Sequence, residues 1–365
     1  MNITIDAKVL DILERGAWDA LPRVRGQIAR LFTASCAGYD YSHHASLTAA
    51  GGQLVASWSN GHNGEDLPGQ VQSWCRRAPE GRWGTPQILA RSPMLAAAAT
   101  TAINGGSAEG TERLTVFFSE YKGRVQDGTG GTGKWSLPVV TGALVNDPVT
   151  GAWLWTELCL YDLLLNEGPR CTSSGRWVMT GEDHAGRTQV IYSDSPVLTA
   201  NSSWHQVALE CGAGSVFKNE PSWYECANGT LVLWMRDDGG SQRLWVAFSA
   251  DMGATWSVPV PSAVPDAVSK CRAGTLSTGT RYLILNPNLS TERIPLVMLL
   301  SQDGWHLDRA LLLRDEATAP HLPGRYKGSG YQYPCSLELD GQLHLIYSVN
   351  KEEVEVQSLA LSDIG

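Results

Sequence analysis

The sequence has no long apolar run and no basic stretch. No segment reaches the roughly 18 consecutive apolar residues of a membrane-spanning helix, and the N-terminal residues MNITIDAKVLDILERG mix acids with apolar side chains, unlike a secretory signal. The formal net charge is −9, and lysine and arginine are nowhere dense enough to hold nucleic acid or an anionic membrane. We therefore expect a cytoplasmic protein, a monomer or weak homo-oligomer, with neither nucleic acid nor membrane as a partner.

Paired cysteines are also missing. The eight cysteines are scattered singly with no C-x-x-C pair, which disfavours a zinc site or a disulfide scaffold and favours reduced core cysteines. No D-x-D-x-D-G calcium loop occurs. We expect no required cofactor and no catalytic metal, and a structural calcium ion near an axis or in a loop stays an open alternative.

What the chain does contain is a repeat. Helical periodicity is convincing only near the N-terminus, and the remainder alternates in short runs between Gly, Asn and Asp, which is typical of an all-β fold. Six strand-turn-strand units recur with turn glycines 50 to 65 residues apart: GGQLVASWS, EGTERLTVFFS, SSGRWVMTG, ANGTLVLWM, STGTRYLILN and LDGQLHLIYS. This period predicts a single β-propeller of four-stranded antiparallel blades over residues 1–365. Residues 1–20 form a partly helical extension, and N- and C-terminal strands close the ring.

One turn carries an architectural motif. Residues 249–256 read SADMGATW and match the Asp-box pattern S-x-D-x-G-x-T-W, with degenerate versions at residues 301–305 and 78–83. In such a turn Asp251 bonds the backbone while Trp256 packs into the sheet, on the face away from the functional site. The motif indicates fold rather than chemistry.

Residues 41–70 concentrate polar side chains. The run HHASLTA, the turn GG and the run QLVASWSN predict a β-hairpin, which places His43 and His44 beside Asn60, His62 and Glu65. Imidazoles that meet at a loop end are suited to proton transfer near neutral pH. Because side chains alternate along a strand, at least one of the adjacent histidines is expected only to pack or to support the other.

These features resemble a known family. The Asp box, the unit EPSWYECANGTLVLWMRDD and the closing unit YKGSGYQYPCSLELDGQLHLIYSVNKEEVEV resemble the sialidase-like BNR propellers over almost the whole chain. The segment HH…WSNG…NGED..GQ looks closer to the propeller-type polysaccharide lyases, such as ulvan lyases and L-rhamnosyl-α-1,4-glucuronate lyases, and to gum-arabic rhamnosidases. That resemblance implies seven blades, whereas six are counted directly.

The lyase resemblance implies a site at the axis built from two histidines, a tyrosine and an arginine. The matching positions are His43 or His44, His62, Tyr121 and Arg170. In a lyase the arginine would neutralise a uronate carboxylate while histidine and tyrosine move protons between C5 and the C4 oxygen. Each of these residues also has a purely structural interpretation. His62 can lie in a solvated loop, Tyr121 can pack in the core, and Arg170 can pair with Glu167.

Further residues are expected to bind the sugar. They comprise amide, acidic, basic and aromatic side chains near the same end of the fold: Asn60, Glu65, Gln70, Arg236, Arg272, Lys327, Tyr331 and Tyr333. His184, in GEDHAGR, reads as a turn residue. True sialidases should instead show an arginine triad, an aspartic acid and a Tyr/Glu nucleophile pair. The chain has no clear R-I-P signature, although Arg236 and Arg272 leave an arginine cluster open.

Three functions therefore compete. The leading one is a lyase of an acidic oligosaccharide or polysaccharide, with a rhamnosyl-glucuronate linkage favoured. The second is an exo-glycosidase, either a rhamnosidase or a divergent sialidase. The third is a propeller that binds glycans without turnover. Absorbance near 235 nm separates the first two, because only elimination leaves an unsaturated uronate.

Overall fold

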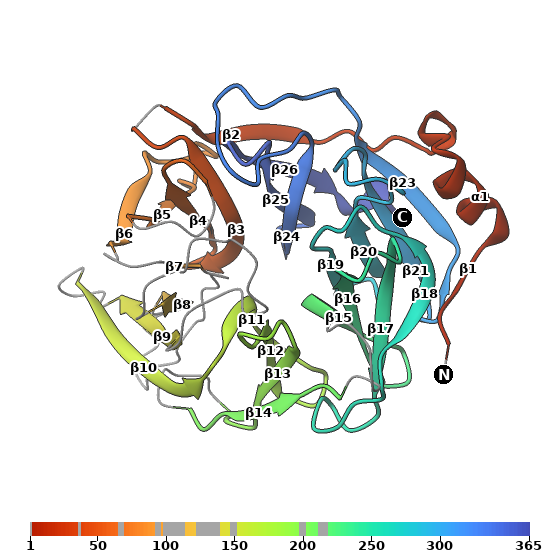
Figure 1. The fold of residues 1–365 in the computed structure, drawn as a ribbon, viewed down its shortest axis with the longest axis horizontal. Coiled ribbons are helices and arrows are strands. Elements are labelled where there is room, and N and C mark those ends of the chain that lie inside the picture. The colour runs from red at the N-terminus through yellow and green to blue at the C-terminus, as the bar shows by residue number, and fades with distance from the viewer. Residues whose placement is uncertain are drawn as a thin grey trace.

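The protein folds into a ring of small β-sheets. The computed structural model describes residues 2–35, 38–64, 69–91, 96–97, 114–121, 139–146, 152–196, 202–210 and 218–365. Six four-stranded sheets surround a central axis, and the first strand of each sheet lies innermost (Figure 1). The all-β propeller expected from the repeat is confirmed. The described sheets match the six units counted in the sequence, and the seventh blade implied by the resemblance has no counterpart among these residues.

Each blade is a continuous antiparallel meander, apart from the last. Blade 1 consists of β3 (Tyr41–Ala50), β4 (Gln53–Gly61), β5 (Val71–Arg76) and β6 (Gln87–Arg91). Blade 2 consists of β7 (Ala96–Ala97), β8 (Thr115–Tyr121), β9 (Val139–Asn146) and β10 (Trp153–Tyr161). Blade 3 consists of β11 (Leu164–Cys171), β12 (Trp177–Glu182), β13 (Thr188–Ser193) and β14 (His205–Ala208). Blade 4 consists of β15 (Lys218–Glu225), β16 (Leu231–Asp237), β17 (Arg243–Ser249) and β18 (Val260–Pro265). Blade 5 consists of β19 (Arg272–Thr275), β20 (Arg281–Leu285), β21 (Leu296–Ser301) and β23 (Arg309–Arg314).

Blade 6 joins the two ends of the chain. It contains β24 (Tyr331–Leu339), β25 (Gln342–Val349) and β26 (Glu353–Ala360), and its outer strand is β2 (Gln27–Thr33) from the N-terminal part. Arg30 of β2 binds Glu353 at 2.9 Å and Glu355 at 2.8 Å. The short helix α2 (Leu361–Ile364) follows β26. The ring is thus closed by backbone pairing and by ion pairs between sequence-distant strands.

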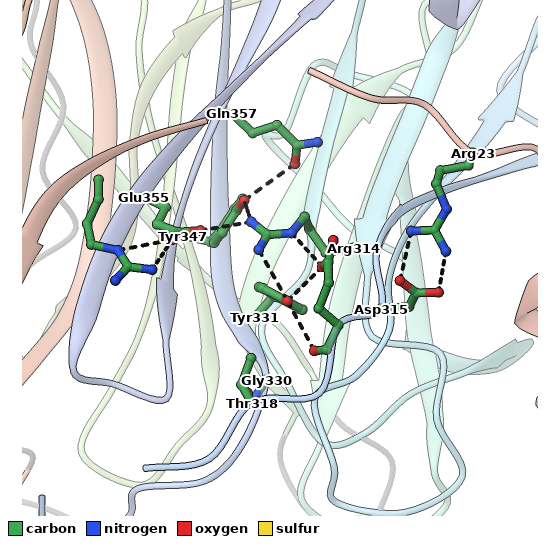
Figure 2. Close-up of polar contacts among 11 residues, drawn as sticks. Arg23, Arg314, Asp315, Thr318, Gly330, Tyr331, Tyr347, Glu355 and Gln357 are labelled. Carbon is green, nitrogen blue, oxygen red and sulfur yellow. Dashed lines mark hydrogen bonds and ion pairs between the residues drawn. The ribbon is translucent and has the colours of Figure 1, made fainter. Parts of the chain in front are cut away.

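Arg314 ties blade 5 to this closing blade. From the end of β23 it donates to Tyr347 at 2.5 Å, to Glu355 at 2.8 Å and to Tyr331 at 3.3 Å (Figure 2). The Arg314 and Glu355 side chains are 12% and 4% exposed. Removing one partner of a buried pair leaves an uncompensated charge, so this contact resists separation of the two blades.

The N-terminal extension covers the outside of blades 4 and 5 (Figure 1). It comprises β1 (Thr4–Ile5), which pairs with β22 (His306–Leu307), then α1 (Ala7–Arg15) and the 3-10 turn η1 (Trp18–Ala20). Asp6 caps α1 by accepting hydrogen bonds from the amides of Lys8 and Val9. None of the helices in the described ranges is long and apolar enough to span a bilayer.

The Asp-box turn forms as its sequence predicts. Asp251 accepts from the Thr255 amide at 2.8 Å and from its hydroxyl at 2.6 Å, and Trp256 packs against the core between blades 3 and 4. This turn joins the third and fourth strands of blade 4, at the end of the ring where the inner strands finish. The inner strands begin at the opposite end, which we call the entry face.

Candidate active site

Four inner strands bulge, β11 among them between Leu165 and Arg170, and the other three bulges each contain a non-glycine residue with a positive φ. The pairing register shifts between His43 and Ser46 in β3, between Asn219 and Ser222 in β15, and between Gln332 and Cys335 in β24. Within these bulges His44, Glu220 and Tyr333 have φ values of 50°, 47° and 54°. A positive φ at a non-glycine residue costs about 1–3 kcal/mol, and such strain concentrates at functional sites. These three bulges therefore point to one region shared by blades 1, 4 and 6.

Tyr333 is the centre of that region. Its hydroxyl donates to Glu220 Oε1 and accepts from Arg236 Nη1 at 2.9 Å. The same Arg236 nitrogen binds Glu220 Oε2 at 2.7 Å, while Arg236 Nε binds Asp238 at 2.8 Å. Because the phenol, the carboxylate and the guanidinium contact one another, a proton leaving Tyr333 has an acceptor and the resulting phenolate has a cation.

The charges in this group are fixed by their contacts. Burial would raise the pKa of Glu220, but Arg236 and the Tyr333 hydroxyl outweigh it and hold the pKa below the ordinary value of 4.5. Burial also opposes the charge on Arg236, and Glu220 nevertheless raises the Arg236 pKa well above its ordinary value. Glu220 is therefore ionised at neutral pH and available as a base toward Tyr333.

Two further cations flank the tyrosine. Arg293 lies with its guanidinium carbon 5.2 Å from the Tyr333 ring centre, and Lys351 Nζ lies 5.6 Å from it. Arg293 also donates to Gln332 at 2.7 Å, and its carbonyl accepts from the Tyr331 amide at 2.9 Å. A side chain at Gly330, whose φ is 109°, would clash with that carbonyl. Together with Arg236 these groups make the surroundings of Tyr333 attractive to a carboxylate.

The predicted histidines do meet this tyrosine. The ring centres of His43 and Tyr333 lie 4.0 Å apart, and those of His44 and Tyr333 lie 5.4 Å apart. His43 is fully buried and its Nδ1 contacts Ser348 Oγ at 2.9 Å, whereas His44 is partly exposed and lines the axial cavity. The alternation expected along a strand does not hold here, because the bulge at His44 brings the two imidazole rings to 4.6 Å from each other, both against Tyr333.

Arg170 and Arg272 meet below this group, along the axis. Glu167 joins them, at 2.8 Å from Arg170 and 3.0 Å from Arg272. Arg170 also donates to the carbonyls of Ala273 and Trp223, and Arg272 donates to Ser336. The Arg170–Glu167 pair raised as an alternative is present, and it is largely buried. The prediction that Arg170 binds a substrate carboxylate stays a prediction.

The remaining predicted residues lie outside the Tyr333 group. Asn60 is buried and bonds Ser42, Trp58 and Ser73 within blade 1, and Gln70 is buried at the start of β5. Lys327 pairs with Glu352 at 2.9 Å, and Tyr331 belongs to the Arg314 network. His62 is exposed at the entry end of blade 1, with its ring 5.0 Å from that of Tyr39.

Two predicted residues fall beyond what the structure describes. Tyr121 ends strand β8, but its side chain is outside the description, and Glu65 lies outside the described residues altogether. His184, taken as a turn residue, does lie in a turn, where its Nδ1 contacts Asp162 at 2.5 Å. Within the described ranges, no group of three or more His, Cys, Asp or Glu side chains is arranged to hold a metal ion.

Sequence reasoning missed Glu220, Arg293 and Lys351. A local signal for Glu220 was present, because the bulges of β15 and β24 share an amide, a polar residue and a proline: N-E-P at residues 219–221 and Q-Y-P at 332–334. The related N-E-G-P at residues 166–169 begins the axial cluster. A residue before proline is forced away from helical φ and ψ, which suits a bulge. Arg293 and Lys351 come from loops between strands and have no such signal.

Over the residues that the structure describes, fold and site together define a propeller of six blades with a tyrosine, a carboxylate and several cations at its entry face. A family model described as a BNR repeat-like domain matches residues 52–345, and the chain belongs to this family. No curated protein matches the sequence.

Solved structures of similar fold include several sialidases. "Hadza microbial sialidase Hz136" is 17% identical with a TM-score of 0.69, over 92% of this chain and 69% of that one. The intramolecular trans-sialidase from Ruminococcus gnavus, solved with oseltamivir carboxylate, is 13% identical with a TM-score of 0.66, over 92% and 98%.

A further structure described as "Sialidase" is 17% identical with a TM-score of 0.58, and the match covers 98% of this chain but 35% of that one. This chain therefore spans about a third of that protein's length. At these identities the likeness shows the fold.

Proposed function

We propose that the chain is a retaining exo-glycosidase that removes a terminal carboxylate-bearing sugar, of the sialic acid class, from a glycan. The observation that carries this proposal is the Tyr333 hydroxyl held between Glu220 and Arg236. Sialidases are the glycosidases that use tyrosine as nucleophile in place of a carboxylate. The sialidases among the proteins of similar fold favour the same class.

In the first step Tyr333 Oη attacks the anomeric carbon while its proton passes to Glu220. The bond from that carbon to the leaving oxygen breaks, and the leaving oxygen takes a proton from a general acid. A neutral phenol approaches a carboxylate-bearing carbon with less repulsion than an anionic nucleophile would. Arg236 stabilises phenolate character on Tyr333 in the transition state.

In the second step water attacks the glycosyl-tyrosine. The deprotonated acid group takes a proton from the water, and Glu220 returns its proton to the departing Tyr333 oxygen. Two displacements at one carbon retain its configuration. We assign the acid role to His62, because it is exposed at the entry end of blade 1 and imidazoles serve as general acids in enzymes.

Substrate binding follows from the cations around Tyr333. Arg293 and Lys351 lie within 6 Å of its ring, and Arg236 contacts its hydroxyl. A carboxylate next to the anomeric carbon would be held by these groups, in charge-assisted hydrogen bonds of which arginine makes the more directional ones. The missing R-I-P arginine leaves His43 and His44 in the blade 1 part of the site, so we expect a substrate range different from that of enzymes with three arginines.

A lyase of uronate-containing glycans is the second candidate. The contact of the His43 and His44 rings with Tyr333 favours it, because a phenol and imidazoles beside several cations are also what abstraction of the C5 proton needs. A rhamnosyl-glucuronate linkage is the preferred target of this candidate. A propeller that binds glycans without turnover is the third.

One assay distinguishes the three. The full chain is incubated with sialylated oligosaccharides, aryl sialosides and a panel of uronate oligosaccharides, while free sugar and absorbance near 235 nm are followed. Release of the acidic sugar with retained configuration by NMR supports the glycosidase. Growth of absorbance at 235 nm on a uronate substrate overturns it in favour of the lyase, and binding without any product favours the third candidate.

His62 has its own test within this assay. His62→Ala should lose activity on natural glycans by about 10²-fold or more, as expected for a general acid, and lose much less on an aryl glycoside whose leaving group needs no proton. Equal losses on both substrates would remove His62 from the acid role without affecting Tyr333.

A further inference from the structure

A buried cluster of three cations lies on the axis beneath Tyr333. Lys270, Arg170 and Arg272 surround the single carboxylate of Glu167. Glu167 is 4% exposed, Arg272 7% and Lys270 9%. Ser222 also donates to Glu167, at 2.5 Å. The cluster therefore holds two positive charges more than negative ones, in a place largely shielded from water.

The same groups line a small cavity of about 30 Å³. Its walls include His44 and Tyr333 above and Asn166, Arg170, Lys270 and Arg272 around. One water needs about 10–15 Å³ of such space. The cavity therefore admits one or two particles of that size and is too small for a sugar ring.

Donors in the cluster remain unused. In the described part of the chain Lys270 Nζ has one hydrogen-bond acceptor, the carbonyl of Asn166, although an ammonium group can donate three hydrogen bonds. The Nε of Arg170 is buried and has no acceptor. Burial and the neighbouring Arg272 also lower the pKa of Arg170, which reflects uncompensated positive charge.

We propose that the axial cavity is a binding site for a small monovalent anion of the chloride type, held by Lys270 and Arg170 with Arg272 behind them. Buried charges are normally paired, and an anion here offsets one of the two excess positive charges. Phosphate and sulfate, with four oxygens around a central atom, exceed the space. The site lies below the Tyr333 group and does not depend on the proposed function.

An anion at this point would connect three blades. Lys270 and Arg272 belong to blade 5 and the segment leading into it, Arg170 to blade 3, and Tyr333 to blade 6. Loss of the anion would weaken the packing beneath Tyr333 and the contacts between the three blades. The expected signs are a lower melting temperature without halide and a smaller change in activity.

The test uses the full chain in gluconate buffer, whose anion is too large for the cavity, titrated with sodium chloride or bromide at constant ionic strength. A saturable rise in Tm of about 2 °C or more is expected, because a ligand that binds only the folded state stabilises it by mass action. Crystals grown in bromide should show an anomalous peak within hydrogen-bond distance of Lys270 Nζ.

Matched variants complete the test. Lys270→Met should abolish the saturable response, Lys270→Arg should keep a weakened one, and Lys8→Met, on the exposed face of α1, should leave it unchanged. The bromide crystal needs no variant, so a misfolded Lys270→Met does not leave the proposal untested. Water alone in the axial cavity of that crystal, or a salt response identical in all folded variants, would overturn the proposal.

Discussion

Strand β24 carries two tyrosines, and each of them contacts an arginine and a glutamate. Tyr331 contacts Arg314 at 3.3 Å and Glu316 at 2.8 Å, and Tyr333 contacts Arg236 at 2.9 Å and Glu220. Both groups thus consist of a phenol, a guanidinium and a carboxylate. Their surroundings differ, and we propose a structural role for Tyr331 and a chemical role for Tyr333.

The Tyr331 group lies between blades 5 and 6. Arg314 also binds Tyr347 and Glu355 there, and Tyr331 is fully buried (Figure 2). Burial raises the pKa of Tyr331 well above its ordinary value, so the phenol stays protonated. A phenol that stays protonated and is held between two blades in this way stabilises the ring.

The Tyr333 group opens onto the axis instead. The bulge in β24 gives Tyr333 a positive φ and places it in the wall of the axial cavity, in contact with the rings of two histidines. The chemical composition of a cluster is therefore a weak guide to function. The backbone decides which groups surround the cluster, and the bulge places Tyr333 beside two histidines and the cations of the entry face.

The largest expected effect separates the two tyrosines directly. Tyr333→Phe should lower kcat by about 10³-fold or more, because the nucleophilic oxygen is removed while the ring remains. Tyr331→Phe should leave kcat within about threefold and lower Tm instead. Steady-state kinetics and thermal unfolding of both variants check this, and equal losses of activity would erase the distinction.

The next effect concerns the carboxylates. Glu220→Gln should lower kcat by about 10²–10⁴-fold, because Tyr333 loses the base that takes its proton. Glu225→Gln, at the other end of the same strand, is the control and should keep full activity. If Glu220→Gln retained turnover across the pH range, the base would have to be another group.

A stability effect is expected from the structural group. Arg314→Met should lower the free energy of unfolding by about 3 kcal/mol, since it leaves Glu355 buried with one arginine fewer. Activity per folded molecule should not change. Denaturant unfolding measures this, with Arg309→Met from the same strand as a control, and a loss below that of the control would mean that Arg30 alone satisfies Glu355.

The smallest expected effect is a pH dependence of the free energy of unfolding that arises from Glu316. Arg314 and Tyr331 hold the pKa of Glu316 at about 2 against the opposing effect of burial. A lowered pKa in the folded state stabilises the protein above the unfolded value near 4.5, and this gain is lost as pH falls toward 2. Because the Glu316 side chain is 58% exposed, the gain should be below about 1 kcal/mol.

The contribution of Glu316 is measured by comparing the unfolding free energies of wild type and Glu316→Gln. Their difference in unfolding free energy should be constant from pH 7 to about 5.5 and should shrink below about 4.5, where the unfolded carboxyl takes up a proton. A difference that grew on acidification would reverse the sign and show that the Glu316 pKa is raised.

The sequence was sufficient for the fold but only partly for the site. Turn glycines, alternating strands and the Asp box at residues 249–256 are local signals, and they predicted the propeller and its six repeats. The hairpin of residues 41–70 likewise indicated His43 and His44 at the axis. Such features depend on neighbours in the sequence, which a single chain displays.

Contacts between residues of different blades could not be predicted from these local signals. Tyr333 and Glu220 are 113 residues apart, and their contact depends on how two blades are oriented about the axis. The sequence named Tyr331 and Tyr333 together because both precede the same strand. Only the bulge at Gln332–Cys335, a matter of backbone register, sends them to different neighbours. The sequence named the pair of Arg170 with Glu167, three residues away, as an alternative, but it gave no sign of the contact between Glu167 in blade 3 and Arg272 in blade 5.

The central claim is that Tyr333 forms a covalent bond with the sugar. The most direct measurement incubates the full chain with a fluorinated, slowly hydrolysed analogue of a sialic-acid-type sugar and identifies the labelled peptide by mass spectrometry. The account predicts a glycosyl adduct on Tyr333 that is absent in Tyr333→Phe and present in Tyr331→Phe. Inactivation with the adduct on another residue, or turnover of sialosides with no adduct at Tyr333, would contradict it.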